Sequence, residues 1–346
     1  MSMNRDVCMI IASYIVRNRY KLLDWINEDY LIKCNLELNV NSIDYIDTED
    51  NYNNINWKNI SGNKNAINLL RNNLDKINWY SLSFNKNAID ILKSNPTKIN
   101  WSNLSLNKNA IEILTENKDK INWNILSLNK NAIELLKKNP DKIDWYNLSS
   151  NVNAIEILKE NQNKLSWSAL SSNSNAIELL KENLDKIDWE RLSFNSNAIE
   201  ILKENPDKIN WYYLSENPNA IELLKENILE GRDKINWSLL STNPNAIELL
   251  KENPDKINWS FLSENPNAIE LLKDNEDKID WYELSDNPNA IKLLKANQNK
   301  INWTYLSFNP NAIELLKENP DKINWKCFSE NPAIFELDYK QMRINF

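Results

Sequence analysis

A single tryptophan recurs along most of this chain at a fixed spacing. Neighbouring copies are 22 residues apart, except for one step of 26 residues. The thirteen copies are Trp57, Trp79, Trp101, Trp123, Trp145, Trp167, Trp189, Trp211, Trp237, Trp259, Trp281, Trp303 and Trp325. A fixed period of about 20 to 50 residues is the signature of a solenoid, whose units bury their apolar faces only against their neighbours. The 346 residues therefore predict one continuous stack rather than several independent globular domains.

Each repeat predicts two short helices. The consensus is W-x-x-L-S-x-N-P-N-A-I-E-L-L-K-E-N-P-D-K-I-N. Asparagine followed by proline is typical of an N-cap and a first helical turn, so we expect helices over residues 244–252 and 254–262 and their counterparts. Helices of about nine residues are too short to be stable alone in water, so stacking of tryptophan, leucine and isoleucine in a common core must stabilise them.

The predicted fold class is all-α, an α-solenoid of about thirteen 22-residue helical hairpins with N- and C-terminal caps. Packing at roughly 8 to 10 Å per layer predicts a rod or superhelix on the order of 100 Å long. A 22-residue period also suits leucine-rich repeats, and L-S-x-N matches part of their consensus. Helix is favoured, because the apolar position two before that leucine is Ser, Tyr, Lys, Asn, Glu or Thr here.

The repeat divides the chain into three regions. The solenoid is assigned to residues 56–331, between an N-terminal helical cap over residues 1–55 and a C-terminal cap and tail over residues 332–346. In the N-terminal region, helix is expected over residues 6–17. Its sequence from Leu22 to Trp25 looks like a worn copy of the tryptophan segment.

Two further features leave alternatives open. The apolar pattern of residues 7–23 resembles a degenerate F-box, although the Leu-Pro that usually opens that motif is missing, so the region is either a cap or an interaction module. The 26-residue step holds four extra residues at 228–231, about one helical turn. The first interpretation is a lengthened helix with Gly231 at its C-cap, and the alternative is a hinge.

Composition argues against several partner classes. The net charge is −8 with lysines and acids interleaved, which disfavours duplex nucleic acid as a partner. Histidine is absent and the three cysteines are scattered, so no metal site, cofactor or disulfide framework is predicted. No apolar run reaches the ~18 residues that span a bilayer, and the N-terminal stretch lacks a signal-peptide cleavage site. We therefore expect neither membrane insertion nor secretion.

The sequence contains no constellation of unlike groups that catalysis would require, so the chain is predicted not to be an enzyme. Solenoids conserve core positions and vary exposed ones. The variable positions are the two after each tryptophan and the one between serine and asparagine. Their aromatic residues are the candidate partner-binding residues Tyr80, Phe84, Tyr212, Tyr213, Phe261, Tyr282, Tyr305 and Phe308.

The segment N-P-N-A-I-E-L-L-K-E-N-P-D-K-I-N-W resembles the short Asn-rich, Trp-containing repeats of giant DNA viruses of the mimivirus type, across the whole array. The resemblance implies a viral product acting in the host cytoplasm or viral factory, and it implies no activity for particular residues. The leading hypothesis is a scaffold or adaptor that binds a viral or host protein. The alternatives are a self-assembling structural component, an F-box-like ubiquitin-ligase adaptor, and single-stranded RNA binding, which the acidic charge disfavours.

Overall fold

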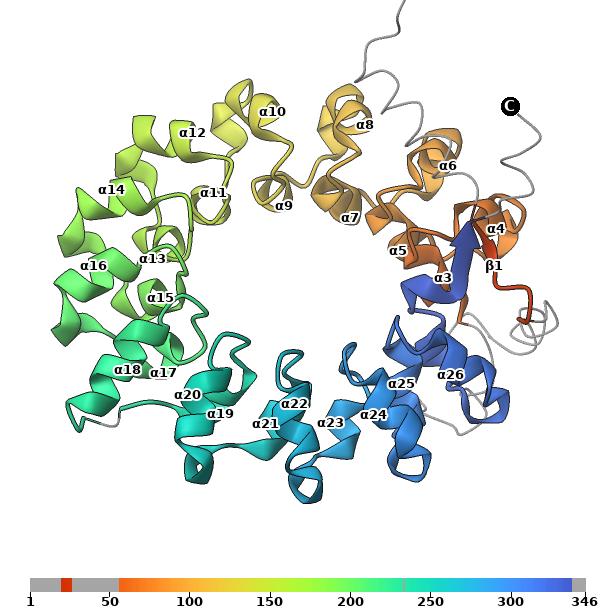
Figure 1. Cartoon of the computed structure of the whole chain (residues 1–346). Helices are drawn as coiled ribbons and strands as arrows, with labels where there is room; N and C mark the ends of the chain where they lie inside the picture. The colour runs from red at the N-terminus through yellow and green to blue at the C-terminus, as the bar shows by residue number, and fades with distance from the viewer. Residues whose placement is uncertain (1–19, 27–55, 233, 338–346) are drawn as a thin grey trace, which may run out of the picture. The chain divides into compact units, whose positions relative to one another are not determined.

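The computed structural model describes residues 20–26, 56–232 and 234–337 (Figure 1). In every repeat but the last, one α-helix begins at the tryptophan and a second begins at the isoleucine of N-A-I-E. We call these the Trp helices and the Ile helices. Apart from two three-residue strands, the described chain is built from such short helices, so the prediction of an all-α solenoid is confirmed.

The elements alternate regularly along the chain. The Trp helices are α3 (Trp57–Gly62), α5 (Trp79–Phe84), α7 (Trp101–Leu106), α9 (Trp123–Leu126), α11 (Trp145–Ser149), α13 (Trp167–Ser171), α15 (Trp189–Phe194), α17 (Trp211–Leu214), α19 (Trp237–Thr242), α21 (Trp259–Glu264), α23 (Trp281–Leu284), α25 (Trp303–Phe308) and α27 (Trp325–Phe328). The Ile helices are α4 (Ile67–Arg71), α6 (Ile89–Ser94), α8 (Ile111–Glu116), α10 (Ile133–Lys137), α12 (Ile155–Glu160), α14 (Ile177–Lys181), α16 (Ile199–Glu204), α18 (Ile221–Leu229), α20 (Ile247–Glu252), α22 (Ile269–Lys273), α24 (Ile291–Ala296) and α26 (Ile313–Lys317). A short 3-10 turn such as η10 (Pro254–Lys256) follows each Ile helix except α18.

The chain divides into two compact units, which we describe separately. The central unit spans Leu114–Lys300, and the terminal unit combines the residues up to Ile113 with those from Ile301 onward. Neighbouring Trp helices contact one another, as α13 and α15 do in the central unit and α3 and α5 do in the terminal unit. The central unit is curved, and from α9 to α18 its Trp helices lie on the inner side and its Ile helices on the outer side (Figure 1).

Each Trp helix is capped by the residue that precedes its tryptophan. Asn258 is the N-cap of α21, and its side chain accepts a backbone hydrogen bond. The Ile helix α20 begins after Ala246, which has no side-chain cap. The predicted capping role of the Asn-Pro pairs was therefore wrong for the Ile helices, whereas the second pair places Asn253 at the N-cap and Pro254 at the first residue of a 3-10 turn instead of a long α-helix. Residues 243–244 lie before α20, and residues 253–254 open η10, where the fixed φ of proline suits the tighter turn.

Leucine, isoleucine and alanine form the core, and most tryptophans lie at its edge. The leucine three residues after each tryptophan is fully buried where it occurs, as Leu192 is. Of the thirteen repeat tryptophans only Trp57 and Trp325 are buried, so the expected tryptophan core was wrong for the other repeats. A lysine of the same repeat covers several of these half-exposed rings, and Lys300 lies 4.5 Å from the centroid of Trp281.

A buried ladder of serine and asparagine joins neighbouring repeats. The side chain of the serine four residues after the tryptophan accepts a hydrogen bond from the backbone amide of the residue that caps the next Trp helix. In one such bond, the Asn210 amide nitrogen lies 2.9 Å from Ser193 Oγ. The asparagine two residues later donates from Nδ2 to two carbonyls of the preceding repeat. For Asn195 these are the carbonyls of Ser171 at 3.0 Å and Asn173 at 3.2 Å. Such bonds satisfy polar groups that burial would otherwise leave unpaired.

The four extra residues at 228–231 lengthen one Ile helix. Helix α18 has nine residues, and Gly231 follows it with φ of 69°. The Gly231 amide donates to the Ile228 carbonyl at 2.8 Å and the Arg232 amide to the Asn227 carbonyl at 3.1 Å, which is a Schellman motif. The lengthened helix is thus confirmed, with Gly231 one position beyond the C-cap. The serine–asparagine ladder continues across this step, which does not support the hinge alternative.

In the terminal unit the first and last repeats stack on each other, and we call this junction the seam. The Asn56 amide donates to Ser329 Oγ at 2.9 Å, and Asn63 Nδ2 donates to the Asn331 carbonyl at 3.1 Å. The same types of bond join consecutive repeats elsewhere in this unit. The two ends of the array therefore meet within this unit, which the repeat period did not predict.

Two strands lie beside the seam. Strand β1 (Tyr20–Leu22) pairs antiparallel with β2 (Phe335–Leu337), with Lys21 opposite Glu336. The helix predicted over residues 6–17 lies outside the described residues, as does the F-box-like stretch before residue 20.

Candidate interaction surface

Most of the exposed hydrophobic side chains of the repeat stand on the Trp helices or directly after them. The third and fourth residues after each tryptophan face the core and the first and fifth face outward, whereas the second is mostly half-buried and is buried at Asn103 and Ala169. Nine of the twelve exposed large hydrophobic side chains in the described chain stand at the first, second or fifth position, so they concentrate on one layer of the solenoid. The nine are Tyr80, Phe84, Leu106, Leu128, Tyr146, Phe194, Tyr212, Phe261 and Tyr282.

The eight predicted binding residues differ in exposure. The exposed fractions are 56% for Tyr80, 52% for Tyr212, 46% for Tyr282, 42% for Phe84 and 38% for Phe261. The half-buried residues are Tyr213, Tyr305 and Phe308. A role confined to the core is therefore excluded for the first five, whereas the other three combine packing with partial exposure.

Within each compact unit, these residues lie on particular Trp helices. In the terminal unit, Tyr80 and Phe84 lie on α5 with ring centroids 6.2 Å apart, and Tyr305 and Phe308 lie on α25. In the central unit, Tyr212 and Tyr213 lie on α17 with ring centroids 5.1 Å apart, whereas Phe261 and Tyr282 lie on the adjacent helices α21 and α23.

Sequence reasoning missed four exposed side chains of the same surface. They are Leu106, Leu128, Tyr146 and Phe194. Each stands one or five residues after a tryptophan, so the register that identified the other candidates could have found them. The aliphatic members extend the apolar surface over repeats that carry no exposed aromatic ring, such as the repeat of Trp123.

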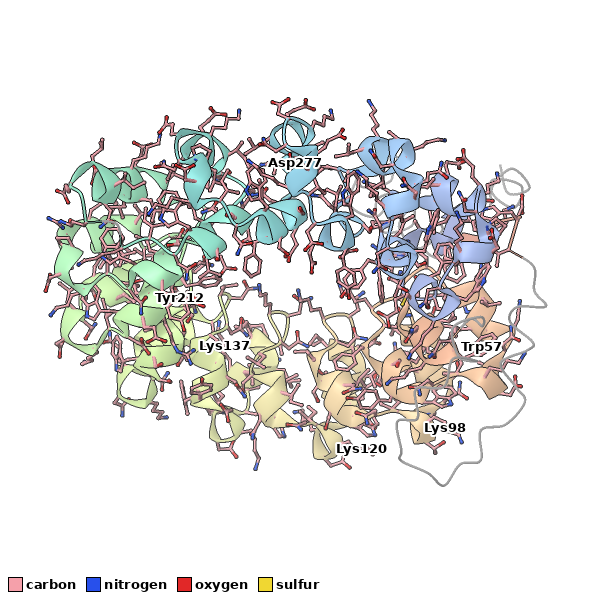
Figure 2. The ribbon with its side chains drawn as sticks, turned by 90° about the horizontal axis from the view of Figure 1, so that it is seen from below. Trp57, Lys98, Lys120, Lys137, Tyr212 and Asp277 are labelled. Atoms are coloured by element: carbon pink, nitrogen blue, oxygen red, sulfur yellow. The ribbon has the colours of Figure 1, made fainter. Side chains whose placement is uncertain are left out.

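The layer of Ile helices and 3-10 turns is charged instead. Lys120 and Asp277 project from the outer edge of the central unit (Figure 2). Many Ile helices carry an exposed pair of glutamate and lysine three residues apart, such as Glu200 and Lys203 with 3.1 Å between Oε1 and Nζ. The two layers of the solenoid therefore offer different surfaces, one charged and one with exposed aromatic and aliphatic groups.

Carboxylates gather on the Trp-helix layer of the central unit. Glu264, Glu283 and Asp286 line a hollow of about 320 Å³. The pKa of Glu264 is raised mainly by burial and further by the neighbouring Glu283 carboxylate. Burial also raises the pKa of Asp286. On α17 a hydrogen bond to Glu190 raises the pKa of Tyr213. This part of the surface combines negative charge with exposed aromatic rings.

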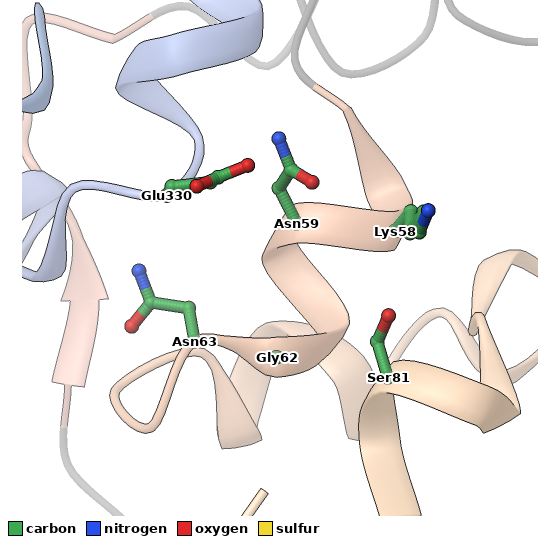
Figure 3. Close-up of a pocket in the computed structure, with 6 residues that line it drawn as sticks. All are labelled: Lys58, Asn59, Gly62, Asn63, Ser81 and Glu330. Carbon is green, nitrogen blue, oxygen red and sulfur yellow. The ribbon is translucent and has the colours of Figure 1, made fainter. Parts of the chain in front are cut away.

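A second hollow lies at the seam, where Gly62 stands at the fifth position after its tryptophan. Every other repeat carries a side chain there. The hollow has a volume of about 320 Å³ and is lined by Lys58, Asn59, Gly62, Asn63, Ser81 and Glu330. Figure 3 shows Glu330 and Asn59 approaching each other from the last and first repeats, with Ser81 contributed by α5. The hollow is shallow and open to solvent, and most of its lining residues have polar or charged side chains.

The described residues show little that could support metal or thiol chemistry. Within them no group of three His, Cys, Asp or Glu side chains is placed to hold a metal ion. Burial raises the pKa of Cys327 to about 11, so this thiol is protonated at neutral pH. None of the described helices is long and apolar enough to span a bilayer.

Comparison with known proteins adds no assignment. No protein-family model matches the chain, and no match is found among curated proteins or solved structures. The resemblance to giant-virus repeats therefore stays a prediction based on the repeat consensus.

Proposed function

We propose that the chain is a non-catalytic scaffold that binds a protein partner through the exposed side chains of its Trp helices. The observation that supports the proposal is the concentration of exposed hydrophobic side chains at variable positions of an otherwise regular repeat. Tyrosine and phenylalanine are typical anchors of protein interfaces, and a stacked solenoid holds them on a rigid layer. With the resemblance to giant-virus repeats, we propose that the partner is met in the cytoplasm or viral factory of an infected host cell.

The alternatives receive less support from the same surfaces. End-to-end self-assembly needs available stacking surfaces, but at the seam the first and last repeats occupy each other's surfaces. Single-stranded RNA would meet the carboxylates of Glu264, Glu283 and Asp286 on the layer that carries the aromatic rings, and these would repel its phosphates. The F-box hypothesis concerns residues that are mostly outside the described ranges.

Alanine variants of the two units test the proposal separately. The central-unit variant combines Tyr212→Ala, Phe261→Ala and Tyr282→Ala, and the terminal-unit variant combines Tyr80→Ala and Phe84→Ala. Affinity capture from infected cells, quantified by mass spectrometry, should show at least a tenfold loss of a specific partner for one of them, because anchor residues cost ~2 kcal/mol or more each.

The matched control combines Leu74→Ala and Leu184→Ala, which remove exposed apolar side chains of the 3-10 turns, outside the Trp helices. It should capture the same proteins as the unmodified chain. Far-UV circular dichroism must show that all variants retain the helical fold. If both surface variants retain every captured protein at the unmodified level, the proposal is refuted.

A further inference from the structure

The last repeat lacks an Ile helix. After α27 the chain continues as η14 (Pro332–Ile334) and β2, whereas every earlier repeat places an Ile helix at this point. The core of a solenoid repeat needs both layers, because each short helix is stable only when its apolar face is covered. The last repeat must therefore be covered by residues from elsewhere.

Residues 20–26 supply that cover from the other end of the chain. Strand β1 pairs with β2, and the Leu23 amide donates to the Ile334 carbonyl at 3.1 Å. Ile26 is only 5% exposed. A segment more than 300 residues away in sequence thus continues the packing that an Ile helix provides in the other repeats.

Trp25 makes the central contact of this segment. Its ring lies 5.9 Å from the ring of Phe328, nearly parallel to it at 25°, and 6.4 Å from the ring of Trp325. In the preceding repeat Lys322 covers Trp303 at 4.7 Å, and the residue at the equivalent sequence position 19 residues after Trp325 is isoleucine rather than lysine. Trp325 and Phe328 are both buried, whereas the tryptophans of most repeats are half-buried. Trp25 therefore covers the ring that a lysine covers elsewhere.

The same segment also reaches the first repeat, because β1 lies against α4. It therefore touches both sides of the seam. We propose that residues 20–26 act as a strap that completes the last repeat and holds the seam closed. Lys21 also pairs with Glu336 at 3.1 Å, but both side chains are partly exposed, so Trp25 and the strand pairing carry most of the effect.

Hydrogen exchange of the full chain tests the strap. In Trp25→Ala, the amides of residues 56–63 should exchange at least tenfold faster than in the unmodified chain, because the Asn56 and Ser329 groups separate more often. Residues 78–85 make the same ladder bonds across a covalently continuous junction and should be unchanged. Trp25→Phe retains an aromatic ring against Phe328 and should restore most of the protection.

A second variant tests the strap independently, in case Trp25→Ala does not fold. Leu23→Pro removes the amide that bonds to the Ile334 carbonyl and should open the seam with the same local pattern. The proposal is overturned if residues 56–63 keep unmodified exchange rates in both variants. It is also overturned if exchange rises equally at residues 56–63, 78–85 and 188–195, since the segment would then stabilise the whole chain rather than the seam.

Discussion

Asparagine has four distinct structural roles in most repeats. In the repeat of Trp79, Asn78 caps the Trp helix, and Asn85 donates to the preceding repeat. Asn87 donates to the Lys64 carbonyl at 2.8 Å, and Asn95 donates to the Ile91 carbonyl at the end of the Ile helix at 2.9 Å. The amide side chain suits all four roles because it both donates and accepts.

Removing one ladder asparagine should weaken the fold strongly. Asn195→Ala leaves the Ser171 and Asn173 carbonyls and the Asn197 amide without their partner, and we expect a loss of about 3 kcal/mol in the free energy of unfolding. Asn197→Ala removes a single exposed donor and should cost about 1 kcal/mol or less. Urea unfolding followed by circular dichroism measures both. Equal losses for the two variants would contradict the assigned role of the ladder.

Only part of this chemistry could be predicted from the sequence. The serine and the ladder asparagine are present in all thirteen repeats, which indicates a structural role. Which carbonyls they reach depends on the spacing of neighbouring helices, and a consensus does not specify that spacing. The outward register of the first and fifth positions after the tryptophan was predictable, because helix geometry alone places them opposite the buried leucine.

Element boundaries follow local capping chemistry more than the Asn-Pro pattern. The residue before the tryptophan is Asn in most repeats but Asp144, Ser166, Asp188 and Asp280 in others. All of these types are strong N-caps, and this restricted choice was a signal that the Trp helix begins there. Proline instead starts the 3-10 turn in many repeats, so the predicted second helix began too early.

The two glycines should respond oppositely to alanine. Gly231→Ala forces a side chain into a left-handed backbone and should destabilise the chain by about 1 kcal/mol, although nothing lies within 4 Å of the added carbon. Gly62 lies in helix α3, and the carbon added by Gly62→Ala would lie 4.0 Å from Ser81 Cβ. Because alanine favours the helix more than glycine does, this variant should be neutral or stabilising by up to ~1 kcal/mol. Thermal unfolding measures the stability of both variants against the unmodified chain. Stabilisation by Gly231→Ala would contradict the Schellman assignment.

At the scale of the whole molecule, the repeat period predicts that neighbouring repeats stack, but it does not predict how the two ends of the array meet. The seam pairs the repeats of Trp57 and Trp325, and residues 20–26 cover the latter through contacts across the length of the chain. No periodic signal links these segments, although the resemblance of Leu22–Trp25 to a tryptophan segment was visible. The grouping of exposed aromatic residues also depends on this stacking, so it could not be predicted from spacing alone.

We propose that the Trp-helix layer is the binding surface of a scaffold. Site-specific photo-crosslinking in infected cells tests it most directly, with a photoreactive phenylalanine analogue in place of Tyr212 or Tyr282 and, as control, in place of Leu184 on the 3-10 turn η8 (Leu184–Lys186). We expect a discrete crosslinked protein at Tyr212 or Tyr282 and none at Leu184. A crosslink at Leu184 alone, or no crosslink at either tyrosine, would contradict it.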